Sequence, residues 1–213
     1  MSLFSALKDV FFRNYNPKDY WEERSRSYVH EYRLGERGLH DQDKMNPLLI
    51  ESLREIKPNS LLEIGCGFGR NLKLIAEKLP KCKLNGTDIS AGMIDNARKF
   101  LGEKAALKVM KANALEFPDK SFDAVLSSVV LVHVPKRDIK KTLSEIARVA
   151  KRRIILLEPD IGRVTLADQM IKSKHITLHN YEDLFSEIPD FKLVSKTPTE
   201  HEKVSRYVFD RVS

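Results

Sequence analysis

The chain has 213 residues, of which 42% are hydrophobic and 31% are charged, and its formal net charge at pH 7 is +7. This composition is typical of one globular domain with added segments, and it excludes a fibrous or low-complexity chain. Two cysteines, Cys66 and Cys82, are too few for a disulfide framework or a four-ligand zinc site. We therefore expect no bound metal ion. No apolar run approaches the about 20 residues of a membrane span, and we expect a cytoplasmic protein.

The basic balance of the chain permits an acidic partner such as RNA or an anionic lipid. Its charges are spread along the sequence rather than gathered into a tail. This distribution favours a solvated basic surface over a nucleic-acid surface.

The N-terminal residues predict a helical segment that precedes the main domain. Residues 1–13 carry apolar side chains at helical spacing, and we expect that helix to end near Asn16-Pro17. Residues 19–28 are rich in both aromatic and charged side chains. We therefore divide the chain into an N-terminal helical cap, residues 1–44, and a main domain, residues 45–213.

The main domain opens on a helix and continues as alternating strands and helices. Asn46 is the expected N-cap of this helix, with Pro47 at its first helical position. Short apolar runs alternate with amphipathic stretches as far as Pro159. The predicted strands of this part are residues 60–64, 83–88, 106–110, 122–130 and 153–158.

The pattern changes after Pro159. Asn180 can cap a short helix through Ile188, and residues 191–196 and 204–212 predict two strands joined as an antiparallel hairpin. Repeated strand–helix units imply a parallel sheet. We therefore expect an α/β protein with a doubly wound, Rossmann-like seven-stranded sheet that is mostly parallel, has an antiparallel C-terminal strand and carries helices on both faces.

The glycine-rich stretch that follows the first strand predicts a ligand site. Gly65, Gly67 and Gly69 stand between an apolar run and the start of a helix. Glycine allows a sharp turn and close approach of a ligand, and a helix N-terminus favours an anionic group. A dinucleotide fingerprint would place its third glycine where Arg70 stands, so a nicotinamide oxidoreductase is a weaker alternative.

Asp88 is the second candidate binding residue. It stands 19 positions after Gly69 (88 − 69) and ends the second predicted strand. In a doubly wound sheet this position brings its carboxylate beside the glycine loop, within reach of ribose hydroxyls.

Several motifs in order resemble the class I S-adenosylmethionine (SAM)-dependent methyltransferases. These are Glu63-Ile-Gly-Cys-Gly-Phe-Gly69, Thr87-Asp88-Ile89-Ser90, Asn113-Ala114 and Ser121-Phe-Asp-Ala-Val125. The resemblance is strongest to the branch that methylates small molecules, the methyltransferase type 11-like proteins, and it covers about residues 45–160.

The resemblance implies SAM as cofactor and S-adenosylhomocysteine (SAH) as product. It places the glycine loop against the methionine part of SAM, Asp88 on the ribose hydroxyls, Ile89 and Met93 beside the adenine, and Ser128 near the sulfonium. The aromatic residues of the N-terminal cap, among them Tyr20 and Trp21, would close over the cofactor, and simple packing of an N-terminal helix is the alternative. The cofactor-binding residues that it implies are Tyr28, Glu63, Gly65, Cys66, Gly67, Gly69, Asp88, Ile89, Met93, Asn113, Ala114, Ser128 and Val129.

The residues that follow the fourth strand bear on the methyl acceptor. Ser127-Ser-Val-Val130 stands where Asn/Asp-Pro-Pro-Tyr/Phe would mark methylation of an amide or of a base amino group. His133 is the candidate base if the acceptor must lose a proton, and its alternatives are a structural role and a pocket contact. His175 and His179 lie where substrate residues often lie in this fold, and a surface position is the alternative.

We expect a methyltransferase that modifies an oxygen or nitrogen atom of a small metabolite. The alternatives are an RNA (tRNA or rRNA) methyltransferase and a non-catalytic SAM-binding partner protein. The motifs select neither the acceptor nor an oligomeric state.

Overall fold

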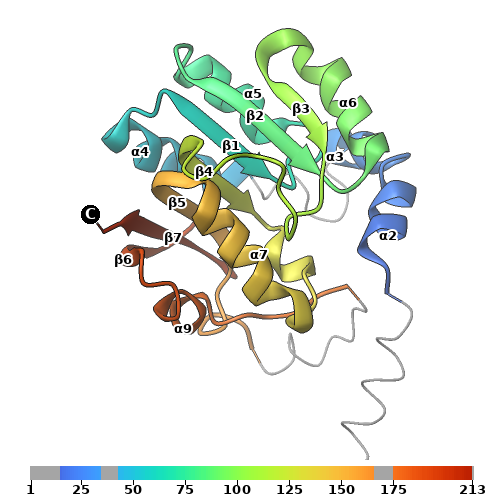
Figure 1. Cartoon of the computed structure of the whole chain (residues 1–213). Helices are drawn as coiled ribbons and strands as arrows, with labels where there is room; N and C mark the ends of the chain where they lie inside the picture. The colour runs from blue at the N-terminus through green and yellow to red at the C-terminus, as the bar shows by residue number, and fades with distance from the viewer. Residues whose placement is uncertain (1–14, 35–42, 166–174, 213) are drawn as a thin grey trace, which may run out of the picture.

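The computed structural model describes residues 15–34, 43–165 and 175–212. The described residues form a seven-stranded sheet with the strand order β3-β2-β1-β4-β5-β7-β6 (Figure 1). Strand β7 runs antiparallel between β5 and β6, and the other pairs are parallel. This arrangement confirms the predicted fold class. The strands are β1 (Ser60–Ile64), β2 (Lys83–Asp88), β3 (Ala106–Val109), β4 (Phe122–Ser128), β5 (Ala150–Pro159), β6 (Phe191–Pro198) and β7 (Val204–Arg211).

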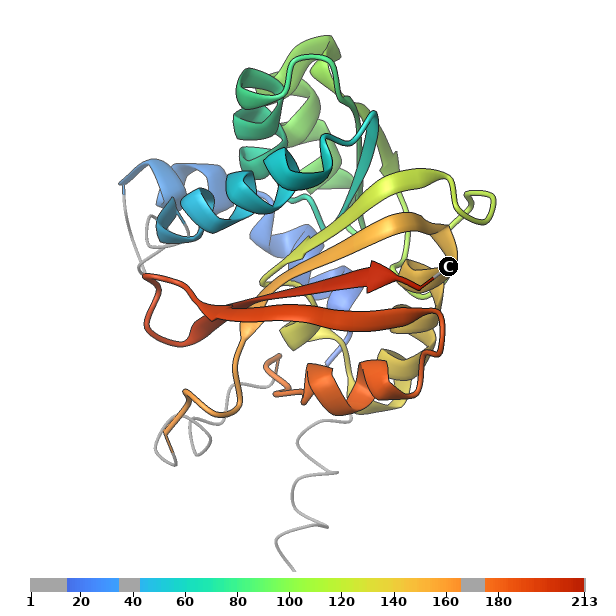
Figure 2. The same cartoon turned by 90° about the vertical axis from the view of Figure 1, so that its left-hand side faces the viewer.

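Helices cover both faces of this sheet (Figure 2). One face carries α4 (Asn46–Ile56), α5 (Arg70–Lys78) and α6 (Ala91–Leu101). The other face carries α7 (Lys136–Val149) and α9 (Tyr181–Ser186).

Neighbouring residues of a central strand belong to opposite cores, because successive side chains of a strand point to opposite faces. Leu61 is fully buried with Leu49 of α4, whereas Leu62 is fully buried with Leu143 of α7. Burial of each leucine side chain contributes about 1.5–3 kcal/mol. The apolar run of β1 therefore anchors both layers and fixes the loop that follows it.

Two short helices, α2 (Pro17–Arg24) and α3 (Tyr28–Leu34), lie beside α6 near the carboxyl ends of the strands (Figure 1). Asn16 caps α2 by accepting a hydrogen bond from the Lys18 amide. Asn16-Pro17 therefore begins a helix here. The helix predicted over residues 1–13 lies outside the described residues.

The prediction that Asn46 is the N-cap of α4 is wrong. A short 3₁₀ turn over residues 43–45 leads into the helix, so Met45 takes the cap position in a helical conformation. The Asn46 side chain instead donates to Asp43 and accepts from Arg70. This asparagine joins the start of α4 to the start of α5.

Some predicted ends also differ from the observed ends. Strand β4 ends at Ser128 rather than at residue 130, because Val129 adopts a left-handed φ of 55° and leaves the sheet. Strand β5 begins at Ala150, three residues before its predicted start. Within the described ranges, no helix has the length and apolar character needed to cross a bilayer.

Candidate functional site

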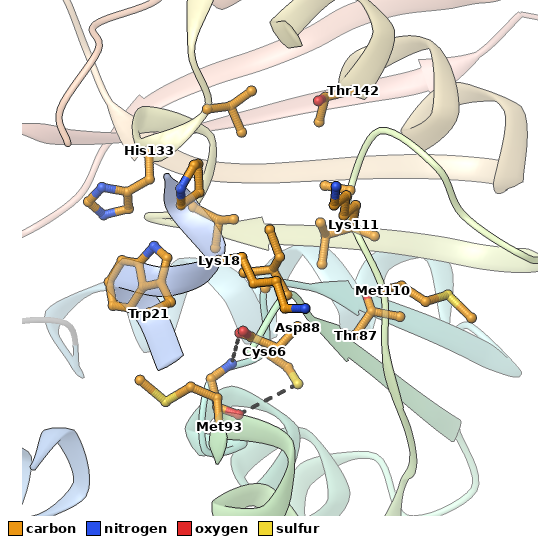
Figure 3. A pocket seen from close by; sticks show the side chains of 18 of the residues that line it. Lys18, Trp21, Cys66, Thr87, Asp88, Met93, Met110, Lys111, His133 and Thr142 are labelled. Atoms are coloured by element: carbon orange, nitrogen blue, oxygen red, sulfur yellow. Dashed lines mark hydrogen bonds between the residues drawn. The ribbon is translucent and has the colours of Figure 1, made fainter. Parts of the chain in front are cut away.

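A cavity of about 490 Å³ lies at the carboxyl ends of the central strands (Figure 3). Its wall includes Gly65 after β1, Asp88 at the end of β2 and Ser128 at the end of β4. The volume falls within the range of about 300–1,000 Å³ that is typical of small-molecule sites. The position is the one at which open α/β sheets bind ligands.

The glycine loop between β1 and α5 forms one wall of this cavity. Gly65, Gly67 and Gly69 have φ values of 63°, 54° and 90°, a region that side chains rarely adopt. A Cβ atom at Gly65 would lie 2.5 Å from the Val130 side chain, whereas one at Gly67 would meet open space. The loop therefore leaves bare backbone at Gly67 for a ligand to approach.

Asp88 faces the glycine loop. Its Oδ2 accepts a hydrogen bond of 2.9 Å from the Gly67 amide, and its Oδ1 accepts one of 2.9 Å from the Ser90 amide. The residue is 8% exposed, and burial raises the pKa of the carboxyl group against the lowering effect of these two donors. Each oxygen retains a second lone pair with which to accept from a ligand hydroxyl.

Glu63 and Asn71 supply unpaired polar atoms to the same cavity. Glu63 is 2% exposed, and its Oε1 accepts a hydrogen bond of 2.6 Å from Asn71 Nδ2. Glu63 Oε2 and Asn71 Oδ1 are buried without a hydrogen-bond partner in the described part of the chain. Burial raises the pKa of Glu63 to about 8. Such orphaned acceptors indicate a place for a donor or a cation of a ligand.

Helix α2 is hydrogen-bonded to the start of α6 and forms part of the cavity wall. The Glu22 carboxylate accepts hydrogen bonds from Ser90 Oγ at 2.8 Å and from the Gly92 amide at 3.2 Å, at the positive end of α6. A Cβ atom at Gly92 would lie 2.1 Å from Ser25 Oγ, so the two segments approach closely. This contact brings Trp21 of α2 into the lining.

The loop after β4 is held by a buried carboxylate that the sequence motifs do not identify. Glu158 is 0% exposed and its Oε1 accepts from Ser127 Oγ, from the Val130 amide and from the Leu131 amide, at 2.8, 2.9 and 3.0 Å. Burial raises its pKa to about 6. In the sequence, Glu158 directly follows the apolar run Ile154–Leu157, and this position could have indicated a buried acidic residue at the end of the strand.

His133 belongs to the 3₁₀ turn η3 (Leu131–His133) and lines the cavity. Its Nδ1 lies 2.8 Å from the carbonyl oxygen of His175. Because a carbonyl oxygen only accepts, Nδ1 carries the hydrogen and Nε2 holds the lone pair of the neutral ring. Burial lowers the pKa of His133 to about 4, which keeps the ring neutral at pH 7.

Aromatic rings surround His133. The edge of Trp21 meets it with ring centroids 4.9 Å apart, and His175 stacks on it at 5.4 Å. Tyr20 in turn stacks on His175, with ring centroids 4.6 Å apart. His175 thus joins α2 to the loop after β4, whereas His179 is buried and its Nε2 lies 3.0 Å from the Val134 carbonyl oxygen.

The cavity brings together most of the residues that the family resemblance implied. Gly69 and Ala114 are the two that do not line it. Gly69 is the N-cap of α5, and the space beside it is filled by Leu101. Ala114 is exposed and forms a bridge to Lys111. The implied residues that do line the cavity are Tyr28, Glu63, Gly65, Cys66, Gly67, Asp88, Ile89, Met93, Asn113, Ser128 and Val129.

Other lining residues were not predicted. Lys18, Arg137, Asp138 and Thr142 come from α2 and α7, and no motif indicates where these helices lie relative to the glycine loop. Phe68 and Asn71 lie within or next to the glycine motif and also line the cavity. Over residues 15–34, 43–165 and 175–212, no three His, Cys, Asp or Glu side chains form a group that could hold a metal ion.

The chain is similar in sequence to known methyltransferases. The family described as "Methyltransferase domain" matches residues 61–153, the segment that holds the glycine loop and Asp88. The demethylmenaquinone methyltransferase of Thermotoga maritima is 32% identical over 127 residues, which are 57% of this chain and 54% of that protein. The aklanonic acid methyltransferase of Streptomyces sp. strain C5 is 36% identical over 97 residues, 43% of this chain and 44% of that protein. The chain thus spans about half the length of these two curated relatives.

A similar fold occurs in the crystal structure of magnesium protoporphyrin IX methyltransferase from Synechocystis PCC 6803, which holds bound SAH. The TM-score is 0.72 at 18% identity, and the match covers 92% of this chain and 98% of that one. At this identity the likeness supports the shared fold alone.

Proposed function

We propose that the chain is a class I SAM-dependent methyltransferase, in line with the methyltransferase domain that matches residues 61–153, and that it transfers the methyl group of SAM to an oxygen or nitrogen atom of a small metabolite. The observation that carries the proposal is the convergence of three groups on one cavity. The Asp88 carboxylate, the bare backbone at Gly67 and the unpaired oxygen of Glu63 all line it.

The lining of the cavity offers partners for four parts of SAM: the ribose, the α-ammonium group, the adenine and the carboxylate. Asp88 has lone pairs for the two ribose hydroxyls. Glu63 Oε2 has no partner, and it would accept from the α-ammonium group once that cation favours the ionised form of the carboxyl group. Ile89 and Met93 offer apolar contact for the adenine, and Asn113 offers an amide for its amino edge. Tyr28, from α3, is the proposed partner of the SAM carboxylate.

SAM supplies a methyl group on a positively charged sulfur, which leaves as the neutral thioether of SAH. The protein then has to align donor and acceptor at near-attack distance and keep water out. The wall formed by Trp21, His133 and the loop after β4 serves this purpose. Glu158 holds that loop in place through its backbone amides.

The relatives differ in the acceptors that their names give, which are demethylmenaquinone, aklanonic acid and magnesium protoporphyrin IX. These names favour a small molecule over RNA for the present chain, and they do not select one acceptor.

Titration calorimetry of the full chain with SAM and with SAH tests the proposal. We expect both ligands to bind, and binding of neither at millimolar concentration would reject it. Transfer of label from methyl-tritiated SAM to RNA rather than to a metabolite fraction would favour the RNA alternative.

A further inference from the structure

The acceptor side of the cavity is formed by α2 and by the start of α7. Trp21 and His133 lie close together there, and Lys18 lies between them and Asp88 in Figure 3. Arg137 and Asp138, from the first turn of α7, complete this side. We call these five residues the acceptor wall.

The acceptor wall is basic. It contains two cations, Lys18 and Arg137, and one acid, Asp138. Asp138 Oδ2 lies 3.5 Å from Arg137 Nε, so the acid already has a cation beside it. Lys18 is exposed and forms no salt bridge with any residue of the described ranges. The wall therefore has an excess positive charge that can attract an anion.

The acceptor wall also lacks a group suited to removing a proton near pH 7. His133 is neutral, and because its pKa is about 4 it would hold an abstracted proton poorly. Tyr15, which also lines the cavity, keeps its proton because burial raises its pKa to about 12. Asp138 is engaged with Arg137. An acceptor that arrives already ionised needs no base at all.

On these grounds we propose that the methyl acceptor is a carboxylate carried by a flat apolar or aromatic group, whose charge Lys18 attracts and whose apolar part packs against the edge-to-face pair of Trp21 and His133. This inference rests on the proposed function and names its substrate class. An edge-to-face pair of rings still offers a ring face to a flat apolar group, and an exposed ammonium group supplies the complementary charge.

The reaction then balances without a proton transfer. A lone pair of the carboxylate oxygen forms the new bond to the methyl carbon, while the sulfur–methyl bond breaks and its electron pair stays on sulfur. The products are a methyl ester and neutral SAH, so one positive and one negative charge disappear. Because the acceptor loses its charge in the transition state, tight ion pairing would slow the reaction. Exposed, solvated cations such as Lys18 attract the anion at little such cost.

Three ligands of similar size and different charge test this proposal. We would saturate the full chain with SAH and titrate phenylacetate, phenylacetamide and phenethylammonium by calorimetry. Trp21 is the only tryptophan of the chain, so its fluorescence reports on the same site. Phenylacetate should bind about threefold more tightly than the amide, as expected for an exposed charge pair, and more weakly as salt rises. Equal or tighter binding of the amide or the ammonium, or no binding of phenylacetate at millimolar concentration, overturns the proposal.

Lys18→Gln is the matching variant, and Lys99→Gln, an exposed lysine of α6 outside the cavity, is its control. We expect Lys18→Gln to remove most of the preference for phenylacetate over the amide and to leave the affinity for SAH within about twofold. If Lys18→Gln weakens SAH and leaves the preference intact, Lys18 serves the cofactor and the proposal fails.

A labelling experiment gives an independent readout. Product labelled from methyl-tritiated SAM and a metabolite pool should release tritiated methanol in mild base, as a methyl ester does. Label that is retained in base overturns the carboxylate while leaving the methyltransferase function intact. Absence of SAM binding in calorimetry, by contrast, would reject the proposed function itself.

Discussion

The carboxylate of Asp88 and the backbone amide of Gly67 are joined by a hydrogen bond of 2.9 Å. This bond connects the end of β2 to the bare turn that follows β1. The same carboxylate is therefore part of the fold of the loop and the proposed acceptor for the ribose of SAM.

Asp88→Ala should lose most of the affinity for SAM. It removes a charged acceptor of two hydroxyls, each worth about 1.5–3 kcal/mol, so the dissociation constant should rise roughly 100-fold or more. Calorimetry with SAM measures this change. Asp95→Ala, at an exposed aspartate of α6, is the control and should bind SAM like the parent chain. An unchanged affinity of Asp88→Ala would refute the ribose role.

Glu63→Gln should change how stability depends on pH. The folded protein raises the pKa of Glu63 from 4.5 to about 8, so the folded state favours the protonated carboxyl. Its contribution to stability is fully present below about pH 4.5 and is lost as pH rises through about 8. The parent chain should lose on the order of 1 kcal/mol per pH unit in this window from Glu63, and Glu63→Gln should not.

Urea unfolding at several pH values without cofactor measures this slope. Glu77→Gln, at an exposed position of α5, is the control and should keep the slope of the parent chain. In calorimetry Glu63→Gln should also bind SAM more weakly, since an amide is a poorer partner for an ammonium group. Parallel stability curves for Glu63→Gln and the parent chain would contradict the interpretation.

Glu158→Ala should destabilise the chain strongly. It removes the acceptor of the Val130 and Leu131 amides and leaves them buried without a partner, at a cost of about 3 kcal/mol or more. Glu158→Gln keeps one acceptor oxygen and should recover part of this loss. Denaturant unfolding at neutral pH compares the two variants with Glu187→Ala, an exposed control. Equal stability of Glu158→Ala and the parent chain would show that the loop has other support.

Gly92→Ala should displace α2 although alanine favours helices by about 1 kcal/mol. The new Cβ atom would lie 2.1 Å from Ser25 Oγ, which prevents the present contact between α2 and α6. We expect a shift in Trp21 fluorescence and weaker binding of phenylacetate to the SAH complex. The double variant Gly92→Ala, Ser25→Gly removes the clash and should restore both readings. If Gly92→Ala alone behaves like the parent chain, the contact between α2 and α6 does not position Trp21 in the site.

The strands and the cofactor loop followed from local signals in the sequence. The bounds of β1 and β2 were predicted to the residue, because apolar runs and turn residues delimit them sharply. Asp88 and the glycine loop came together as expected, since parallel strands end at one edge of the sheet.

The rest depended on contacts between segments that are distant in sequence. Glu158 was overlooked because its partners are amides of a loop that precedes it by more than 25 residues. Lys18 and Arg137 could not be assigned to one site, because nothing in the sequence around either residue indicates that α2 and α7 line the same cavity. Asn46 has the local features of an N-cap, yet a preceding turn took that position.

The placement of β7 between β5 and β6 also affects how the sheet is completed. Strand β6 precedes β7 in the chain but pairs only with β7 in the fold, so β6 takes its native place only after β7 has been synthesised. Until that moment the β5 edge, with Ile154, Ile155, Leu156 and Leu157, is open to pairing with other chains. A chain truncated before residue 204 would therefore be prone to aggregation, even if the part that holds the glycine loop and Asp88 had folded.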